Sequence, residues 1–398
     1  MNILFLSYWG IDEGLSQATV LPHLNILLED DAIQKIIFVS IERDETFLTK
    51  MEDPRIVHLP LHSEQKSNVL LTKMNDFTTF PRLLKKVVAE HEIKAIFCRS
   101  SLAGAIGYLL KRHTGLPLFI ESFEPHAQYM LDVGVWKKWD PRYIAQVFFE
   151  QQQRKYADHL MPVSEQYREK LIKDHGLKEE YVTTIPCCVD PQPFIRATEN
   201  RDAIRSSLNI EGVCGVYVGK FGGLYYDDEA FALFQLAFEV FDNFFLMLLT
   251  PEPHNGIIQQ LEKHGIPSNR VFVEQVAHSE VPDYLAAADI AFATYRNTPS
   301  AKYLSPIKVG EYWASGLPVV LTEGVGDDSD IIDQREYAGV VLDPQNPDDC
   351  QKALQRMQSI IRHPAHREEV RKLAYQYRSF DRTRNVYNTL IRQLADES

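Results

Sequence analysis

The stretch from Ser305 to Val320, S-P-I-K-V-G-E-Y-W-A-S-G-L-P-V-V, predicts a short helix that runs directly into a buried strand. Ser305 suits the N-cap, because its hydroxyl can accept a hydrogen bond from an amide of the first turn, and Pro306 suits the first helical position. Gly316 suits the left-handed residue that ends a helix. The apolar run from Leu317 to Leu321 is typical of a parallel strand that is covered on both faces. The stretch therefore favours a fold of alternating helices and parallel strands.

The same stretch also has the pattern of a nucleotide site. A capped helix start presents free amides and the positive end of the helix dipole, which together attract an anion such as phosphate. Glu311 lies about one and a half turns further along the helix, where its carboxylate could bind both hydroxyls of a ribose. A surface helix in which Glu311 only pairs with Lys308, three residues earlier, also fits the spacing. Spacing alone leaves both interpretations open.

Length and composition indicate a soluble two-domain protein. The chain has 398 residues, and its net charge of −13 argues against nucleic acid as a partner. It has no run of about 18 apolar residues, so no membrane span is expected. Met1–Leu6 is apolar and lacks a basic region, so we expect a strand there and not a signal peptide. The 5 cysteines form no C-x-x-C pair, which favours a reducing cytoplasm and no metal site.

Strands and helices alternate along both halves of the chain. This pattern predicts an α/β protein with two doubly wound Rossmann-like domains, whose parallel sheets face a central cleft. Cys187–Pro191 has the features of a domain linker, because an apolar strand expected at 182–186 stops there and two prolines follow close together. We therefore expect one domain at 1–190 and a second at 191–379.

Three loops follow predicted strands, at the carboxyl ends where parallel sheets hold ligands. The first contains Gly14 and leads into a helical pattern, and the second contains His126 within E-P-H-A-Q-Y-M. The third is G-K-F-G-G at 219–223, in which Lys220 could neutralise a phosphate as a compact point charge. Each loop also has an ordinary interpretation: a glycine turn, a surface or packing histidine, and a solvated lysine.

Two further segments carry suggestive patterns. W-K-K-W at 136–139 combines aromatic and basic residues as membrane interfaces do, whereas a helical lid or plain exposed surface is the alternative. A helix expected at 81–91 adds a basic face. D-S-D at 328–330 could suggest a metal, but favourable carboxylates at a helix N-terminus explain it more simply.

Four segments together carry a family resemblance. They are the stretch at 305–320, V-G-K-F-G-G at 218–223, E-V-P-D-Y-L-A-A-A-D-I at 280–290 and I-P-C-C-V-D at 185–190. In this order they resemble a donor-binding helix, a phosphate loop, the helix and strand before the donor helix, and a domain junction. The family that they resemble is the retaining glycosyltransferases of the GT-B fold, specifically glycosyltransferase family 4. The resemblance spans nearly the whole chain.

The resemblance implies a reaction. A hexosyl or N-acetylhexosaminyl unit would pass from a UDP- or GDP-linked donor to a hydroxyl of a saccharide or glycolipid, with retention of configuration and without a metal or other cofactor. The acceptor would bind to the first domain, and a last helix at about 380–398 would cross back onto that domain. The expected location is the cytoplasm, with a peripheral contact at the inner face of the membrane if the acceptor is lipid-linked.

The resemblance also implies donor-binding residues, which are Gly14, Lys220, Val276, Ser305, Ile307, Lys308 and Glu311. Lys220 takes the place of the basic residue on the diphosphate, and the amides of Ile307 and Lys308 face the distal phosphate. Glu311 holds the ribose hydroxyls.

The remaining roles fall on loops. Backbone near Val276 would read the base, and Gly14 would let the first loop approach the phosphates. His126 matches the family's histidine near the reacting centre of the sugar, so His126 and Lys220 are the expected catalytic residues.

The chain departs from the family at two places. Tyr303 stands where the family has a second acid, and the family's second lysine falls at about Tyr225 or Tyr226. Lys302 or Lys308 could supply the missing charge. These departures leave open a degenerate homologue that binds nucleotide without turnover. A sugar-nucleotide epimerase, which shares this architecture, is a second alternative.

Overall fold

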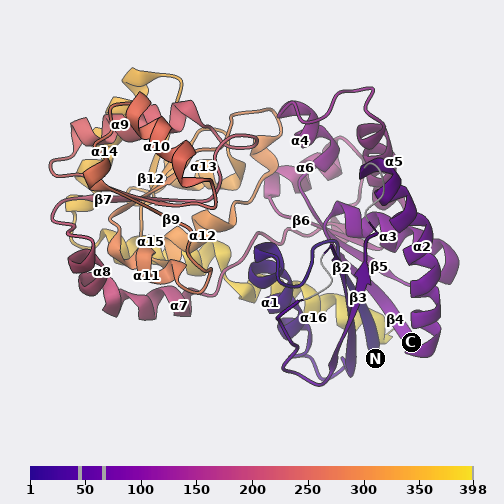
Figure 1. Ribbon diagram of the computed structural model, residues 1–398. Helices are drawn as coiled ribbons and strands as arrows, with labels where there is room; N and C mark the ends of the chain where they lie inside the picture. The colour runs from indigo at the N-terminus through magenta and orange to yellow at the C-terminus, as the bar shows by residue number, and fades with distance from the viewer. Residues whose placement is uncertain (44–46, 65–68, 397–398) are drawn as a thin grey trace. The chain divides into compact units, whose positions relative to one another are not determined.

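The computed structural model describes residues 1–43, 47–64 and 69–396. Its contacts divide the chain into two compact units, Met1–Pro186 with Phe380–Ser398, and Cys187–Ser379. The chain thus enters the second unit a few residues before the expected boundary at 190/191, and it leaves after Ser379. Each unit is built around one parallel sheet (Figure 1).

The sheet of the first unit has six parallel strands in the order β3-β2-β1-β4-β5-β6. The strands are β1 Asn2–Ser7, β2 Lys35–Glu42, β3 Ile56–His62, β4 Ile93–Arg99, β5 Leu118–Phe123 and β6 His159–Pro162. They are almost fully buried in the centre of the sheet, as the continuous apolar runs of the sequence predict. This is the strand order of a Rossmann fold.

Helices cover both faces of this sheet. They are the π-helix η1 Ser16–Val20, the 3-10 helix η2 Glu179–Tyr181, α1 Leu21–Leu27, α2 Val69–Glu90, α3 Ser101–Thr114, α4 His126–Asp132, α5 Pro141–Tyr156, α6 Glu165–Lys173 and α16 Phe380–Asp396. Figure 1 shows α2, α3 and α5 together on one side, while α1 and α16 pack on the other. Side chains of Ser100, Asp140 and Ser164 cap α3, α5 and α6, as short polar residues at helix starts do.

A buried polar network ties α16 to the first unit. Tyr387 of α16 hydrogen-bonds Glu121 of β5 and lies 2.7 Å from Nδ1 of His23 on α1. Arg99, at the end of β4, forms a buried ion pair with Glu121. Burial, and secondarily the Arg99 charge, holds the pKa of His23 well below its usual value, so His23 is neutral. The predicted return of the last helix to the first half of the chain thus has a specific polar anchor.

The sheet of the second unit repeats the arrangement, with the order β12-β11-β10-β7-β8-β9 and all strands parallel. The strands are β7 Cys214–Val218, β8 Phe245–Leu249, β9 Val271–Glu274, β10 Ile290–Ala293, β11 Val319–Thr322 and β12 Gly339–Leu342. Counted from β7, this is again the Rossmann order. The two doubly wound parallel sheets predicted from the sequence are therefore confirmed.

Two apolar clusters lie on opposite faces of this second sheet. One contains side chains of α9 Asp228–Val240, α10 His254–Lys263 and α14 Pro347–Arg362. The other contains side chains of α7 Pro191–Arg196, α11 Val281–Ala287, α12 Ile307–Ala314, α13 Gly326–Asp333 and α15 His366–Arg378. The remaining helices are α8 Arg201–Ser207 and the 3-10 turns η3 Ala197–Asn200, η4 Ser268–Arg270 and η5 Ala301–Tyr303. Figure 1 shows α9, α10 and α14 on one side of the sheet, and α7, α8, α11 and α15 on the other.

Two predicted elements differ from the structure. The helix expected at 81–91 already begins at Val69, and Pro81 lies inside it, where proline removes one amide donor and its ring crowds the carbonyl of Phe77. The strand expected at 182–186 is not part of the sheet. Only Val182 forms an isolated bridge, to Leu160, although the amide of Ile185 still donates to the carbonyl of Pro162 at 2.9 Å. The segment therefore follows the exposed edge of β6 as it leaves the first unit.

In the part of the chain that the structure describes, no helix is both long and apolar enough to cross a bilayer. The five cysteines are buried.

Candidate functional site

The strand order places the candidate donor site of the second unit between β7 and β10. From these two central strands the chain continues towards opposite edges of the sheet, because β7 is followed by β8 on one side and β10 by β11 on the other. In such folds, ligands bind at the carboxyl ends of the two strands where the direction changes. The glycine-rich loop follows β7 directly. Lys220 is exposed in it, and the hydroxyl of Tyr217 donates to the carbonyl of Lys220 at 2.5 Å. Gly219 has a φ of 130°, a conformation that glycine adopts freely.

The start of α12 corrects one prediction. The helix begins at Ile307, and its N-cap is Pro306, with no side-chain cap. Ser305 is not the N-cap, because its hydroxyl is used elsewhere: it accepts from the amide of Cys187 at 3.1 Å and from the guanidinium of Arg378. Pro306 accordingly stands one position before the helix. Gly316 has a φ of 75° and follows the C-cap, so its predicted left-handed role is confirmed.

Arg378 holds the segment before α12 in place. Its guanidinium also donates to the carbonyl of Cys187 at 3.2 Å and pairs with the carboxylate of Asp328 in the first turn of α13. Burial raises the pKa of Asp328 to about 6, with the Arg378 charge acting in the opposite direction. The D-S-D segment is thus a helix start with a buried ion pair. Across residues 1–43, 47–64 and 69–396, no group of three His, Cys, Asp or Glu residues is placed to hold a metal ion.

Glu311 does not pair with Lys308, so that interpretation of the spacing is wrong. Its carboxylate is largely buried and accepts from Nε2 of His278 at 3.1 Å. His278 is 53% exposed, and the hydrogen bond to Glu311 raises its pKa above the usual value. Val276 lies on the same loop between β9 and α11, half-buried against the core. The structure thus brings the loop of Val276 beside Glu311. If the loop contacts the base of a nucleotide and Glu311 contacts its ribose, the two must be neighbours in this way.

Sequence reasoning missed His278. A histidine in A-H-S-E between a strand and a helix has no distinctive pattern, and its partner lies 33 residues away. Lys308 was expected at this site for its amide and as one of two candidates for the missing charge, and its side chain turns inward to the glycine-rich loop. Tyr303, in place of the family's second acid, is nearly buried in η5, and the ammonium of Lys302 lies 5.3 Å from its ring centroid.

His126 of the first unit is the first residue of α4, directly after the carboxyl end of β5. Its Nδ1 lies 2.9 Å from Oε1 of Glu124, and its ring meets that of Trp136 edge-to-face at 5.5 Å between centroids. Phe123, which ends β5, has a φ of 49°, an uncommon conformation for a non-glycine residue that is typical of functional sites. The side chain of His126 is therefore half-buried and fixed by its neighbours, at the carboxyl edge of the sheet, where such folds bind ligands.

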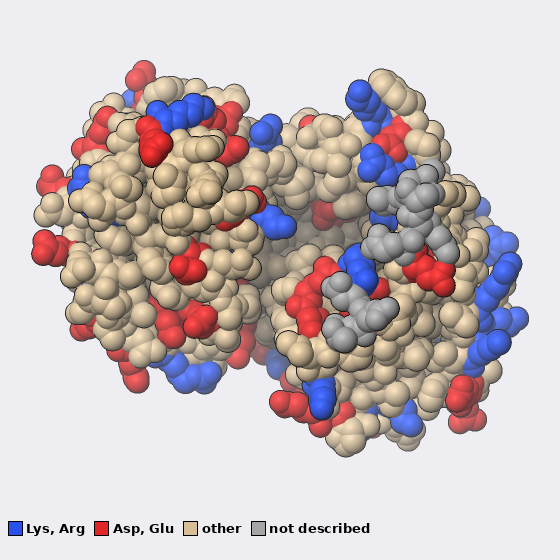
Figure 2. Space-filling view, in the orientation of Figure 1, with Lys and Arg blue, Asp and Glu red and all other residues tan. Residues whose placement is uncertain are grey.

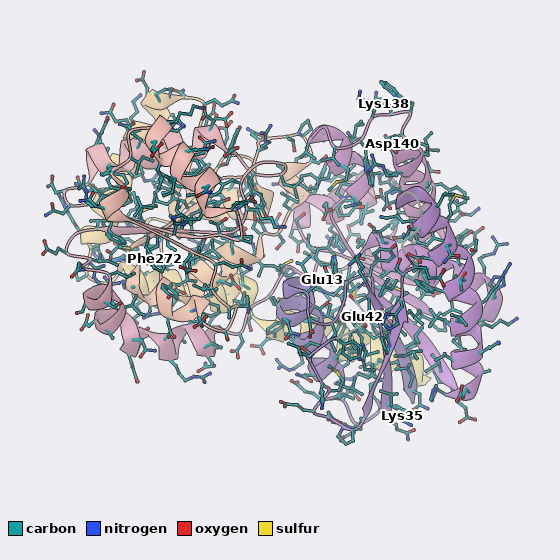
Figure 3. The ribbon with its side chains drawn as sticks, viewed as in Figure 1. Glu13, Lys35, Glu42, Lys138, Asp140 and Phe272 are labelled. Atoms are coloured by element: carbon teal, nitrogen blue, oxygen red, sulfur yellow. The ribbon has the colours of Figure 1, made fainter. Side chains whose placement is uncertain are left out.

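In the first loop, close packing requires a glycine at Gly10 and not at Gly14. A Cβ on Gly14 would meet nothing within 4 Å, and the residue is exposed. A Cβ on Gly10 would instead lie 2.5 Å from Oε2 of Glu42. Glu42 also accepts from the amide of Ile11 at 2.9 Å, and Glu13 accepts from that of Gly10 at 3.0 Å. Figure 3 labels Glu13 and Glu42 in the first unit. Two carboxylates thus fix this loop, while Gly14 stays open to an approaching ligand.

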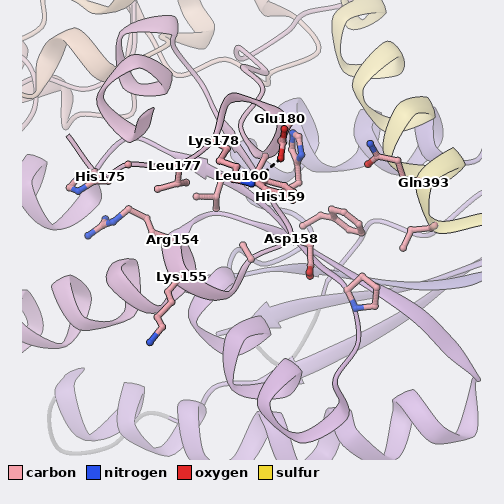
Figure 4. Close-up of a pocket in the computed structure, with 16 residues that line it drawn as sticks. Arg154, Lys155, Asp158, His159, Leu160, His175, Leu177, Lys178, Glu180 and Gln393 are labelled. Atoms are coloured by element: carbon pink, nitrogen blue, oxygen red, sulfur yellow. Dashed lines mark ion pairs between the residues drawn. The ribbon is translucent and has the colours of Figure 1, made fainter. Parts of the chain in front are cut away.

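Cavities of the first unit lie at both edges of its sheet. One of about 820 Å³ opens at the amino ends of β5 and β6, and Figure 4 shows the side chains that line it. His126 lies at the other edge of the sheet, after the carboxyl end of β5. The charged lining of this cavity is mixed, with Arg154, Lys155 and Lys178 against Asp158 and Glu180. A second, apolar groove of about 230 Å³ lies between α2, α3 and α5.

Comparisons with known proteins match both halves of the chain. The family model described as "Glycosyl transferases group 1" matches residues 217–359, which include the glycine-rich loop and α12. The model described as "Glycosyltransferase Family 4" matches residues 47–193, which include His126. The chain belongs to the glycosyltransferases of the GT-B fold.

Individual relatives of this glycosyltransferase are distant. The putative teichuronic acid biosynthesis glycosyltransferase TuaH of Bacillus subtilis (strain 168) is 26% identical over 202 residues, which cover 50% of this chain and 49% of that protein. The chain thus spans about half the length of this curated relative. Sucrose-phosphate synthase from Thermosynechococcus elongatus matches over 100% of both chains, with a TM-score of 0.77 and 16% identity. Anabaena HepE in complex with UDP does so with a TM-score of 0.69 and 14% identity. WaaG, a glycosyltransferase involved in lipopolysaccharide biosynthesis, matches over 97% of this chain and 99% of its own, with a TM-score of 0.68 and 18% identity.

Proposed function

We propose that this protein transfers a hexosyl or N-acetylhexosaminyl unit from a nucleotide-diphosphate sugar to a hydroxyl of a saccharide or glycolipid, with retention of configuration and without a metal. One observation carries the proposal. The glycine-rich loop that carries the exposed Lys220 lies against α12, the helix that carries Glu311, because Nζ of Lys308 lies beside Gly219 and the hydroxyl of Tyr312 accepts from the amide of Val218 at 3.0 Å. A cation and helix amides suit a diphosphate, and a carboxylate further along the helix suits a ribose.

The chemistry of such a transfer fits these groups. Breaking the bond between sugar and phosphate leaves negative charge on the diphosphate, and fixed donors stabilise that charge more in the transition state than in the ground state. A lysine and a helix start supply such donors without a metal ion. His126 would act near the reacting carbon of the sugar. Support for a nucleotide sugar comes from HepE, whose structures are described as complexes with UDP and UDP-glucose.

A thermal-shift screen against UDP, GDP, ADP and their sugars tests the proposal. We expect stabilisation by a UDP or GDP compound, followed by NMR detection of a glycosylated product with retained anomeric configuration. If the sugar of the donor is epimerised without any acceptor, the protein is an epimerase and the proposal fails. Tight binding without turnover on any acceptor would identify a nucleotide-binding protein instead.

Glu311→Ala is expected to weaken binding of the free nucleotide diphosphate by about 1.5–3 kcal/mol, the range for a hydrogen bond to a charged group. The reason is that the ribose loses its only carboxylate partner on α12, while the phosphate contacts remain. Isothermal titration calorimetry with the nucleoside diphosphate selected by the screen measures the change. As a matched control, His278→Gln removes the present partner of Glu311 and keeps the carboxylate, so it should retain most of the affinity. An unchanged dissociation constant in Glu311→Ala would contradict the ribose assignment.

We further propose a lipid-linked acceptor that is presented at the inner face of a membrane. The apolar groove is lined by Met74, Phe77, Trp136 and Phe149, with the cations Lys73 and Arg142 among the lining. Large apolar side chains around it are exposed, and they are Leu71, Met74, Val135, Trp139, Ile144 and Phe148. Figure 2 shows basic side chains on the same unit, and Figure 3 labels Lys138 at the W-K-K-W segment. Exposed aromatics beside cations suit an anionic membrane surface.

Sedimentation with vesicles tests this contact. The protein is expected to pellet at low salt with vesicles that contain an anionic lipid, and less with neutral ones, because lysines near the surface bind anionic headgroups. Trp139→Ser with Phe148→Ser should reduce the bound fraction strongly, since each buried large apolar side chain contributes about 1.5–3 kcal/mol. Tyr375→Ser, an aromatic of the second unit that is as exposed as Phe148, is the control. If the wild-type protein stays in the supernatant at low salt, the membrane contact is wrong.

A further inference from the structure

Lys308 has an unusual environment for a lysine. It is the second residue of α12, yet only 9% of it is exposed. Its ammonium nitrogen is buried and has no hydrogen-bond partner within the described chain. A buried cation without an anion is costly, so a lysine is rarely kept in such a place without a purpose.

Three tyrosines surround the ammonium group of Lys308. Its Nζ lies 4.3 Å from the ring centroid of Tyr225, 4.9 Å from that of Tyr217 and 5.3 Å from that of Tyr295. The rings attract a cation through their negative faces, although more weakly than a carboxylate would. Tyr217 belongs to β7, Tyr225 follows the glycine-rich loop, and Tyr295 follows β10. The cage therefore stands on the two strands between which the donor site lies.

The ammonium group lies against the backbone of the glycine-rich loop. A Cβ built on Gly219 would come within 2.8 Å of Nζ of Lys308. The loop that carries Lys220 and the side chain of Lys308 thus meet at the carboxyl end of β7, near the start of α12. A diphosphate bound to the loop and to the helix start would be the anion that Lys308 lacks.

Burial lowers the pKa of Lys308 to about 7, with the charge of Glu311 opposing the shift. Near neutral pH, a free enzyme therefore holds this side chain partly as an uncharged amine. An anion that binds beside it would favour the ammonium form and raise its pKa again.

We propose that Lys308 is a second diphosphate-binding cation of the donor site, which takes up a proton when the nucleotide sugar binds. This inference rests on the proposed function, because it assumes a nucleotide diphosphate in the site. It gives the protein a replacement for the family's second lysine, whose expected position falls at Tyr225 or Tyr226 and so at the wall of the cage itself.

Other titratable groups around Lys308 act differently. Desolvation raises the pKa values of Tyr217, Tyr225 and Tyr312, so these phenols stay neutral near pH 7. Glu311 is paired with His278, and a ribose that takes Glu311 would free His278 to lose a proton. Proton release at His278 would therefore cancel part of the proton uptake at Lys308, so the experiment must measure the two contributions separately. Lys220 is exposed on the loop.

Calorimetry in buffers of different ionisation enthalpy measures the proton balance. UDP-glucose and GDP-glucose are the probes, because a diphosphate diester does not itself titrate near neutral pH. In a His278→Gln background, we expect uptake of a fraction of a proton per nucleotide sugar at pH 7 to 8, which vanishes below about pH 6. Because the pKa of Lys308 is higher in the complex than in the free protein, the affinity for the nucleotide sugar is greatest below pH 7. Above pH 7 it falls by up to about tenfold per pH unit.

Lys308→Met keeps an unbranched apolar side chain in the cage and should abolish the uptake, while binding at pH 6.5 weakens by about 10- to 100-fold. Lys302→Met, which removes the exposed lysine nearby in sequence, should keep the uptake. If Lys308→Met fails to fold, the pH dependence of nucleotide-sugar affinity and proton uptake in the His278→Gln protein tests the inference by itself. Binding of either probe without proton uptake overturns this inference and leaves the proposed function intact. Absence of binding by these probes and by the corresponding N-acetylhexosamine donors overturns both.

Discussion

Replacing Lys220 by alanine is expected to lower kcat by a factor of about 10² to 10³, the scale for the loss of one donor to a developing negative charge. The side chain is exposed, and the structure gives it no ion-pair partner among the described residues, so its removal should leave the fold intact. Its backbone carbonyl, which accepts from Tyr217, is unchanged by the substitution. The effect should therefore appear in turnover, with kcat and kcat/KM reduced together.

Steady-state kinetics with the donor selected by the thermal-shift screen measures this effect. Lys352→Ala, which removes an exposed lysine on α14, is the matched control and should have wild-type kinetics. An unchanged kcat/KM in Lys220→Ala would remove this residue from the site. Lys220 and Lys308 are both expected to contact one diphosphate, so the double variant is expected to lose less than the product of the two single losses.

Replacing Arg378 by methionine is expected to destabilise the second unit by about 3–5 kcal/mol, because it leaves the Asp328 carboxylate buried without its partner. For a unit of this size, the change corresponds to a fall in Tm of roughly 10 °C. Ser305 and the carbonyl of Cys187 lose a donor at the same time. The start of α12 should consequently be held less firmly, and nucleotide should protect the variant less than the wild-type protein.

The pH dependence identifies the cause. The pKa of Asp328 is already raised to about 6, and without Arg378 it should rise further. The folded variant then holds a proton that the unfolded chain releases above about pH 4, so its stability falls as pH rises through that window. We therefore expect a smaller deficit at pH 5 than at pH 8, measured by thermal unfolding. Arg378→Met combined with Asp328→Leu should recover part of the loss. Equal deficits at both pH values would show that lost packing, and not the buried charge, explains the effect.

Most strands could be predicted because their evidence is local. Continuous apolar runs such as Leu317–Leu321 and the residues of β1 indicate strands that are covered on both faces. Gly316 was identified for the same reason, since a left-handed residue is a property of one position. The segment 182–186 has the same apolar pattern but lies at an edge, where sheet pairing depends on a distant neighbour. That is why it was wrongly predicted as a strand.

Side-chain partners in the candidate site were predicted less well. Ser305 has the chemistry of an N-cap, but Arg378 and Cys187 compete for its hydroxyl. Glu311 and Lys308 have the spacing of a helical ion pair, but one faces His278 and the other faces the tyrosine cage. In each case a contact from a distant segment replaced the local one.

The sequence by itself determined the two Rossmann-like units, the loops at the carboxyl ends of their strands, and the family to which the chain belongs. These follow from apolar periodicity, from glycine and from motif order, which are all local properties of the chain. Only the tertiary structure decided what each charged side chain meets. Burial and partner distance set the charge of Lys308, the pairing of Glu311 and the anchoring of Ser305, and both depend on residues that only folding brings together.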